Sequence, residues 1–246
     1  MAFDFNTIKS KFKDASAVPA VVTVISLLLA LFSGLSLMIT PWPSTDLHVA
    51  LGDLGSNYWY VCIPSLWNII HFVFGLLPMI ILLARFTVVA TKSFSKFLVP
   101  AALVVMIVSM FLHPVQYVCY CIIGWTDFTF KGFFGFFDFW FVLKLLALAA
   151  AVVVPFLHKL YGKYVLAGAS GVCILIVVVN FFKFFSLLLD YADNPYIDYP
   201  FLHIFTSLAG FGATILMFAA IILFVFDDFV APFVNKTLAG IMPKKK

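Results

Sequence analysis

The sequence has few charged residues, only 11% of its 246 residues, and 64% of them are hydrophobic. A soluble domain of this size cannot bury so much apolar surface, so the composition excludes an ordinary water-soluble protein. The formal net charge of +4 comes from basic residues scattered between apolar runs. They form no stripe with interleaved aromatic residues, which excludes nucleic acid as a partner.

Motifs of common enzyme and metal sites are also missing. The chain contains no P-loop, dinucleotide-binding fingerprint, HExxH sequence or nucleophile elbow. The acidic stretch at 190–198 has neither the glycine nor the terminal glutamate of an EF-hand loop. We therefore expect no enzymatic activity, no cofactor and no bound metal.

Cysteine is scarce, with four residues in the chain, and three of them fall near the same ends of two predicted helices. Cys62 is compatible with a disulfide to either Cys119 or Cys121, and all three are also compatible with free thiols. Their spacing lacks the paired Cys-x2–4-Cys pattern of zinc sites. The sequence leaves the disulfide and thiol alternatives open.

Long apolar runs are what the chain does contain. A helix rises 1.5 Å per residue, so about 20 apolar residues cross the roughly 30 Å hydrocarbon core of a bilayer. Six such runs with short connections predict an all-α membrane protein, a bundle of six transmembrane helices in one polytopic domain over 1–246. The predicted helices lie at 18–38, 60–83, 97–120, 136–156, 164–189 and 202–226.

The Lys and Arg residues are distributed unevenly around these helices. Twelve of the fifteen fall in the two terminal segments and in the second and fourth connections. Cytoplasmic segments carry the excess of Lys and Arg, so both termini are predicted to be cytoplasmic. Aspartates, tryptophans and tyrosines gather at the opposite, outer ends, which agrees with this orientation. The expected location is a cell membrane, the cytoplasmic membrane in a bacterium.

Polar side chains inside the spans are costly in hydrocarbon, and they usually face the interior of a bundle or a water-filled cavity. Most of them lie in the outer halves of the predicted helices. A lysine near mid-helix costs about 2.5–3.5 kcal/mol, so Lys144 must be paired, hydrated or deprotonated. The candidates for lining a cavity or binding a solute are Lys144, His71, Asn68, His113 and Asn180.

These candidates also have structural explanations. Lys144 could form an ion pair or extend toward the interface, and the histidines could be satisfied packing residues. Pro114 frees a backbone carbonyl in the same region. The sequence nevertheless predicts no obvious broken helix, and broken helices are typical of many transporters.

Small residues allow membrane helices to approach closely. Ala167 and Gly171 form one pair with small-xxx-small spacing, and Ala209 and Ala213 form another. The last two helices are therefore predicted to meet through Gly171 and either Gly210 or Ala209.

One short sequence, 168–171, resembles the Gly-x-Ser-Gly motif of rhomboid-type intramembrane proteases. Its Ser170 lies near the cytoplasmic end of one predicted helix, whereas His203 lies at the outer end of the next. At 1.5 Å per residue the two are roughly 20 Å apart, beyond the hydrogen-bond reach of a nucleophile and its base. This separation excludes protease activity.

Two functions remain. A non-catalytic structural or accessory membrane protein needs the fewest coincidences and is favoured; its partners are the lipid bilayer and another membrane protein or a second copy of the chain. The alternative is a small transporter or channel-like protein with an outward-facing polar cavity for a small solute, anionic if Lys144 forms its floor. A water-accessible cavity that reaches Lys144 would favour the alternative.

Overall fold

The structure, a computed structural model, describes residues 17–34, 63–87, 93–124, 126–193 and 200–227. These residues form helices and contain no strand. Of the sequence predictions, the alternatives for Cys62 and the residues at 194–198 of the acidic stretch lie outside the described residues.

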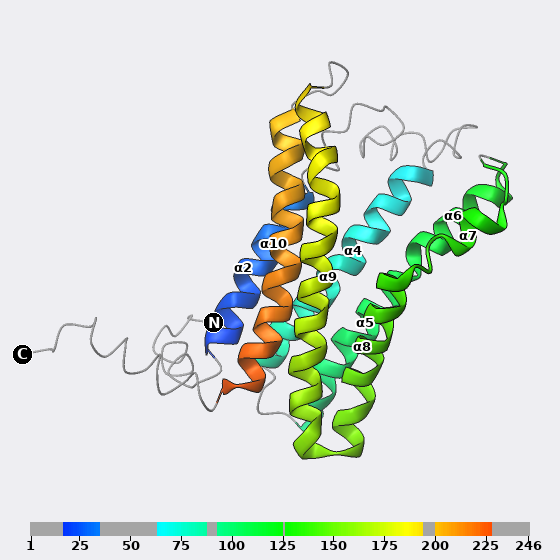
Figure 1. Ribbon diagram of the computed structural model, residues 1–246. Helices are drawn as coiled ribbons and strands as arrows, with labels where there is room; N and C mark the ends of the chain where they lie inside the picture. Colours follow the sequence, from blue (N-terminus) through cyan, green and yellow to red (C-terminus); the bar gives the residue numbers. More distant parts are fainter. Residues whose placement is uncertain (1–16, 35–62, 88–92, 125, 194–199, 228–246) are drawn as a thin grey trace, which may run out of the picture.

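Six helical stretches are long and apolar enough to cross a membrane, which confirms the predicted number. They run in alternating directions, so that α2 begins and α10 ends at the same end of the molecule (Figure 1). In chain order the spans are α2 (Ala17–Gly34), α4 (Ile63–Phe86), α5 (Leu98–Met110) followed by α6 (Leu112–Ile122), α8 (Phe139–Leu157), α9 (Lys159–Asp193) and α10 (Pro200–Val225).

Two helices differ in extent from their predictions. The helix predicted at 164–189 is α9, with 35 residues, and at 1.5 Å per residue its length of about 50 Å exceeds the hydrocarbon core. The helix predicted from residue 136 begins at Phe139, because the carboxylate of Asp138 caps it by accepting the Phe141 N–H at 2.8 Å. Two short helices precede spans: η4 (Ser93–Phe97) precedes α5, and α7 (Phe130–Phe134) precedes α8.

The third span, predicted at 97–120, runs from Phe94 to Ile122 and is interrupted at the single residue Phe111, whose backbone stays in the αR region. Helix α5 ends at Met110 and α6 begins at Leu112. At the junction the Phe111 N–H donates to the Val108 carbonyl at 3.0 Å, which tightens the turn. Pro114 explains the break, because it has no N–H to donate to the carbonyl four residues before it and its ring crowds that carbonyl.

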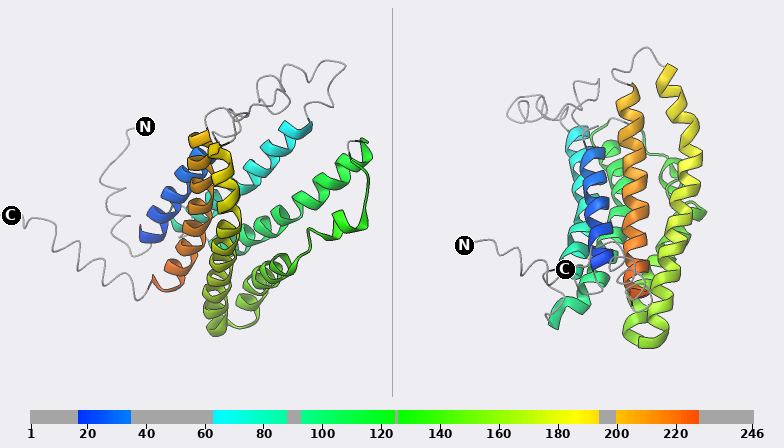
Figure 2. Two further views of the ribbon diagram at one scale, coloured as in Figure 1. Left: turned by 45° about the horizontal axis from the view of Figure 1, so that its top comes forward. Right: turned by 90° about the vertical axis from the view of Figure 1, so that its left-hand side faces the viewer.

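The six spans close into a ring. Each packs against the preceding and the following span, and α10 packs against α2. Helices α4 and α6 lean away from α9 and α10 toward the end where α6 ends and α8 begins (Figures 1 and 2). We refer to this end as the open end, and to the opposite end, where α8 is followed by α9, as the packed end.

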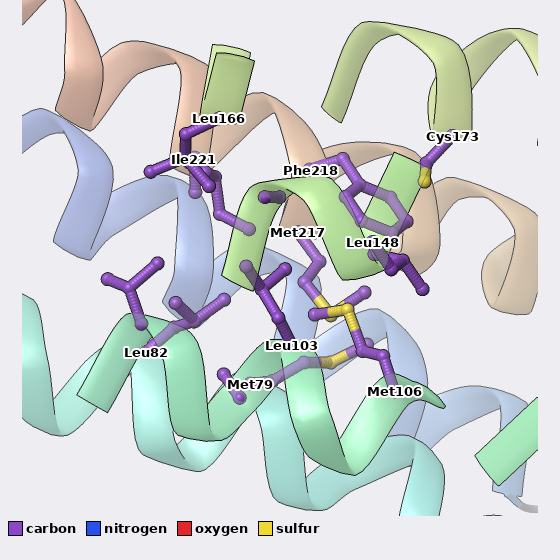
Figure 3. Close-up of a cluster of buried hydrophobic side chains, with 14 of the residues drawn as sticks. Met79, Leu82, Leu103, Met106, Leu148, Leu166, Cys173, Met217, Phe218 and Ile221 are labelled. Atoms are coloured by element: carbon purple, nitrogen blue, oxygen red, sulfur yellow. The ribbon is translucent and has the colours of Figure 1, made fainter. Parts of the chain in front are cut away.

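Apolar side chains fill the ring toward its packed end (Figure 3). In lipid such side chains stabilise the bundle by close packing rather than by leaving water. The largest of the fully buried apolar side chains come from four different spans, and no more than 1% of their surface is exposed: Leu82, Leu103, Leu148, Phe218 and Ile221.

The small residues pack differently from the prediction. A Cβ atom on Gly171 would have no atom within 4 Å, whereas one on Gly210 would lie 2.8 Å from the Ser33 Oγ atom of α2. The Ser26 hydroxyl of α2 also donates to the Ala213 carbonyl of α10 at 2.6 Å. The predicted contact of the last two helices through Gly171 is therefore wrong: the small residues of α10 meet α2.

Aromatic rings contribute to the contact between α9 and α10. The Phe211 ring of α10 lies edge-on to Phe181, with centroids 5.4 Å apart, and 5.8 Å from the ring of Phe184. Such arrangements of aromatic pairs are favourable beyond the area they bury.

Candidate functional site

Lys144, in the first half of α8, lies where three cavities adjoin. The cavities have volumes of about 460, 570 and 390 Å³, and Lys144 is a wall residue of each. Among the residues that the structure describes, no other residue lines all three. Its side chain is partly buried. The ring is thus filled toward its packed end and hollow around Lys144.

The first cavity, of about 460 Å³, lies mainly among α2, α4, α5 and α10. Its polar groups include Asn68 and His71 of α4 and Lys144 of α8. Most of its remaining wall is apolar: Ala30, Phe72, Phe74, Leu76, Pro78, Met79, Met106, Ala213, Met217 and Phe218.

The second and third cavities share Lys144 with the first and are lined partly by other helices of the ring. The second, of about 570 Å³, is lined by His71, His113, Lys144 and Asn180, and also by the capping carboxylate residue Asp138. The third, of about 390 Å³, lies between α8, α9 and α10 and shares Lys144 and Asn180 with the second. A solute in any one of the three cavities would therefore have Lys144 in the wall around it.

Residue spacing explains why one face of α4 supplies so much of the wall. Asn68, His71, Gly75 and Met79 follow one another at intervals of three or four residues, so they share one face of the helix. A Cβ atom on Gly75 would meet nothing within 4 Å, which leaves room in the first two cavities.

Within the described part of the chain Lys144 makes no hydrogen bond or ion pair, and the carboxylate residue Asp138 lines the second cavity with it. Asp138, the acid nearest in sequence, is engaged as the cap of α8. An ammonium group removed from water without a counter-charge is costly, and a bound anion would offset that cost.

The two histidines of the site form a pair. The rings of His71 and His113 are stacked, with centroids 4.2 Å apart. His71 Nε2 is 3.0 Å from the Gln116 Oε1 atom, and the Gln116 amide donates to the Tyr120 hydroxyl at 2.7 Å. This chain of polar groups runs along α6, from the cavities toward the open end.

All five candidates from the sequence line cavities. The first cavity is lined by Asn68, His71, His113 and Lys144. The second cavity is lined by His71, His113 and Lys144 again, together with Asn180. The sequence did not identify the methionines of the wall, because a methionine in an apolar run carries no signal of a cavity.

Two further hydroxyl residues of the wall were also missed. Ser109 donates to the Met106 carbonyl at 2.7 Å, and Thr214 donates to the Gly210 carbonyl at 3.0 Å. Because these hydroxyls are bonded within their own helices, they contribute little polarity to the first cavity.

Four other polar residues noted in the sequence line none of the three cavities: Lys183, Ser170, Cys119 and Cys121. The Lys183 ammonium is 5.5 Å from the centroid of the Trp140 ring, a cation–π contact. The Ser170 hydroxyl donates to the Leu166 carbonyl of its own helix at 2.8 Å. Cys119 and Cys121 form no disulfide with another cysteine of the described residues.

The described residues contain no group of three or more His, Cys, Asp or Glu side chains that could hold a metal ion. Comparison of the chain with protein-family models, curated proteins and solved structures finds no match. A function must therefore be argued from the geometry and charge of the cavities.

Proposed function

We propose that this chain is a multi-pass protein of a cell membrane that takes up a small anionic solute from the outer side and moves it across the bilayer. The single observation that supports this most is the position of Lys144, a cation that forms no ion pair within the described residues and lies on the wall of all three cavities. A cation in a site of low dielectric attracts anions more strongly than it would in water.

The asymmetry of the ring supports access from one side. Buried apolar side chains fill it toward the packed end, and the cavities extend toward the open end. A packed accessory bundle needs neither a hollow nor a lysine without an ion pair. The accessory role favoured by the sequence stays the competing prediction.

The orientation follows from the distribution of Lys and Arg, which places the open end outside and both termini in the cytoplasm. In a variant without native cysteines, Asp127→Cys near the open end should react with a membrane-impermeant maleimide applied to intact cells. Lys163→Cys near the packed end should react only after the cells are made permeable. The reverse pattern of labelling would overturn both the orientation and the outward access.

Uptake into proteoliposomes tests the transport function. Ethanesulfonate is a suitable probe because it stays charged at any working pH and crosses lipid poorly, with choline as the cation and glycerol as the neutral solute. We expect uptake of ethanesulfonate well above that of protein-free liposomes, and no such increase for choline. Equal rates with and without protein, for every solute, would contradict transport and favour the accessory role.

A further inference from the structure

We propose that the solute is an amphipathic monocarboxylate, with its carboxylate at Lys144 and its apolar chain in the first cavity. This inference rests on the proposed function, because it names the class of solute that the same site would take. Two properties of the walls support it. Few charged groups lie around Lys144, and the wall of the first cavity is more apolar than that of the second.

The charges limit the head group to one negative charge. Lys144 is the lone ammonium among the described wall residues of the three cavities, and no arginine lines them. Phosphate groups are usually bound by several cationic or backbone N–H donors. A second carboxylate reaching into the second cavity would meet the side chain of Asp138, which lines it. Like charges in a site of low dielectric repel, so a dicarboxylate is disfavoured.

The first cavity suits an apolar chain. Met79, Met106 and Met217 lie in its wall with only 4%, 5% and 5% of their surface exposed. Figure 3 shows their side chains gathered together from three different helices. Methionine side chains are flexible and polarisable, so they adapt to chains of different shape. A volume of about 460 Å³ lies within the usual range for small-molecule sites.

Polar groups are arranged to fix the direction of binding. Asn68 lines the first cavity together with Lys144, and its side-chain amide can donate hydrogen bonds to a carboxylate. The hydroxyls of Ser109 and Thr214 are bonded to carbonyls of their own helices. A carboxylate thus gains most next to Lys144, and the chain attached to it gains most among the methionines.

A series of straight-chain carboxylates from acetate to hexanoate tests this inference. Binding to the full chain in nanodiscs is measured by isothermal titration, and the signal of Lys144→Met is subtracted to remove partitioning into lipid. Affinity should rise about threefold to fourfold for each added methylene, as expected for burial of apolar surface. Butyrate should bind at least roughly tenfold more tightly than succinate, whose second carboxylate would be left unpaired. Hexanol, which has the chain without the charge, should show no binding that depends on Lys144.

A matched pair of variants on α5 locates the apolar chain. Met106→Gln keeps the side-chain length but makes the wall of the first cavity polar. In this variant the binding affinity should increase much less from acetate to hexanoate. Val108→Gln puts the same amide on the exposed face of α5, outside the three cavities, and should keep the full rise. If Met106→Gln does not fold, the chain-length series of the unmodified protein still decides.

The outcomes separate this inference from the proposed function. Carboxylates that bind through Lys144 with an affinity independent of chain length would overturn the inference and leave anion uptake standing. Tighter binding of succinate, inorganic phosphate or chloride than of butyrate would do the same. Absence of Lys144-dependent binding for every anion, together with absence of uptake into proteoliposomes, would overturn both.

Discussion

Replacing Lys144 with methionine is expected to abolish anion uptake into proteoliposomes and to leave the protein at least as stable as before. Methionine keeps the length of the side chain and removes its charge, so an anion loses its binding partner while the cavity keeps its shape. A charged group within the hydrocarbon core is costly, and the methionine variant does not carry that cost. Uptake of ethanesulfonate and the thermal unfolding temperature in detergent measure the two effects.

Lys96→Met is the matched control for this change. Lys96 is exposed on η4, lines none of the three cavities, and its ammonium lies 5.0 Å from the centroid of the Phe97 ring. Its replacement should leave uptake near that of the unmodified protein. Lys144→Arg keeps the charge in a larger group and should keep part of the uptake. Normal uptake by Lys144→Met would show that the cation is not needed and would remove the anion site.

Replacing Gly162 with alanine is expected to give the largest loss of stability from a single methyl group. Gly162, near the start of α9, packs on α8 so closely that a Cβ atom would lie 2.5 Å from the Pro155 Cα atom and 3.1 Å from its nitrogen. The nearest neighbour is backbone, so α8 and α9 must move apart. Overpacking of this kind typically costs about 1–3 kcal/mol. Thermal unfolding in detergent should show the loss as a lower midpoint.

Gly168→Ala makes the same chemical change on the same helix where there is room for it. A Cβ atom at Gly168 would have no atom within 4 Å. Alanine is favoured over glycine in a helix by about 1 kcal/mol, so this variant should be as stable as the parent or slightly more stable. Equal destabilisation by both variants would mean that the effect comes from helix propensity or lipid exposure and not from the contact with Pro155.

The number and place of the spans could be predicted because crossing a bilayer is a local requirement. About 20 consecutive apolar residues satisfy it whatever the neighbours are. The last span shows this well, with a prediction of 202–226 against the observed Pro200–Val225. Cap residues act through short-range hydrogen bonds, as Asp138 does at the start of α8. The start of α8 at Phe139 is therefore also a local property of the sequence.

The level of the candidate site along the membrane normal could also be predicted. Depth within a helix follows from residue number at 1.5 Å per residue, so polar residues of several helices could be assigned to one layer. That His71 and His113 stack, and that Asn180 shares a cavity with Lys144, depends on how the helices are rotated and on which are neighbours. The sequence thus supplied the layer, and the ring of spans brought its members together.

By itself, the sequence determined an all-α chain with six apolar spans and a layer of polar residues within them. The tertiary structure decided that the spans form a ring, that Gly210 faces α2 while Gly171 faces open space, and that methionines line a cavity beside Lys144. The physical reason is that lipid is as apolar as a packed interior, so a membrane helix needs no polar face to mark its exposed side. Helix α5 is apolar on every side, and only its contacts show which residues pack, which face lipid and which border the cavities.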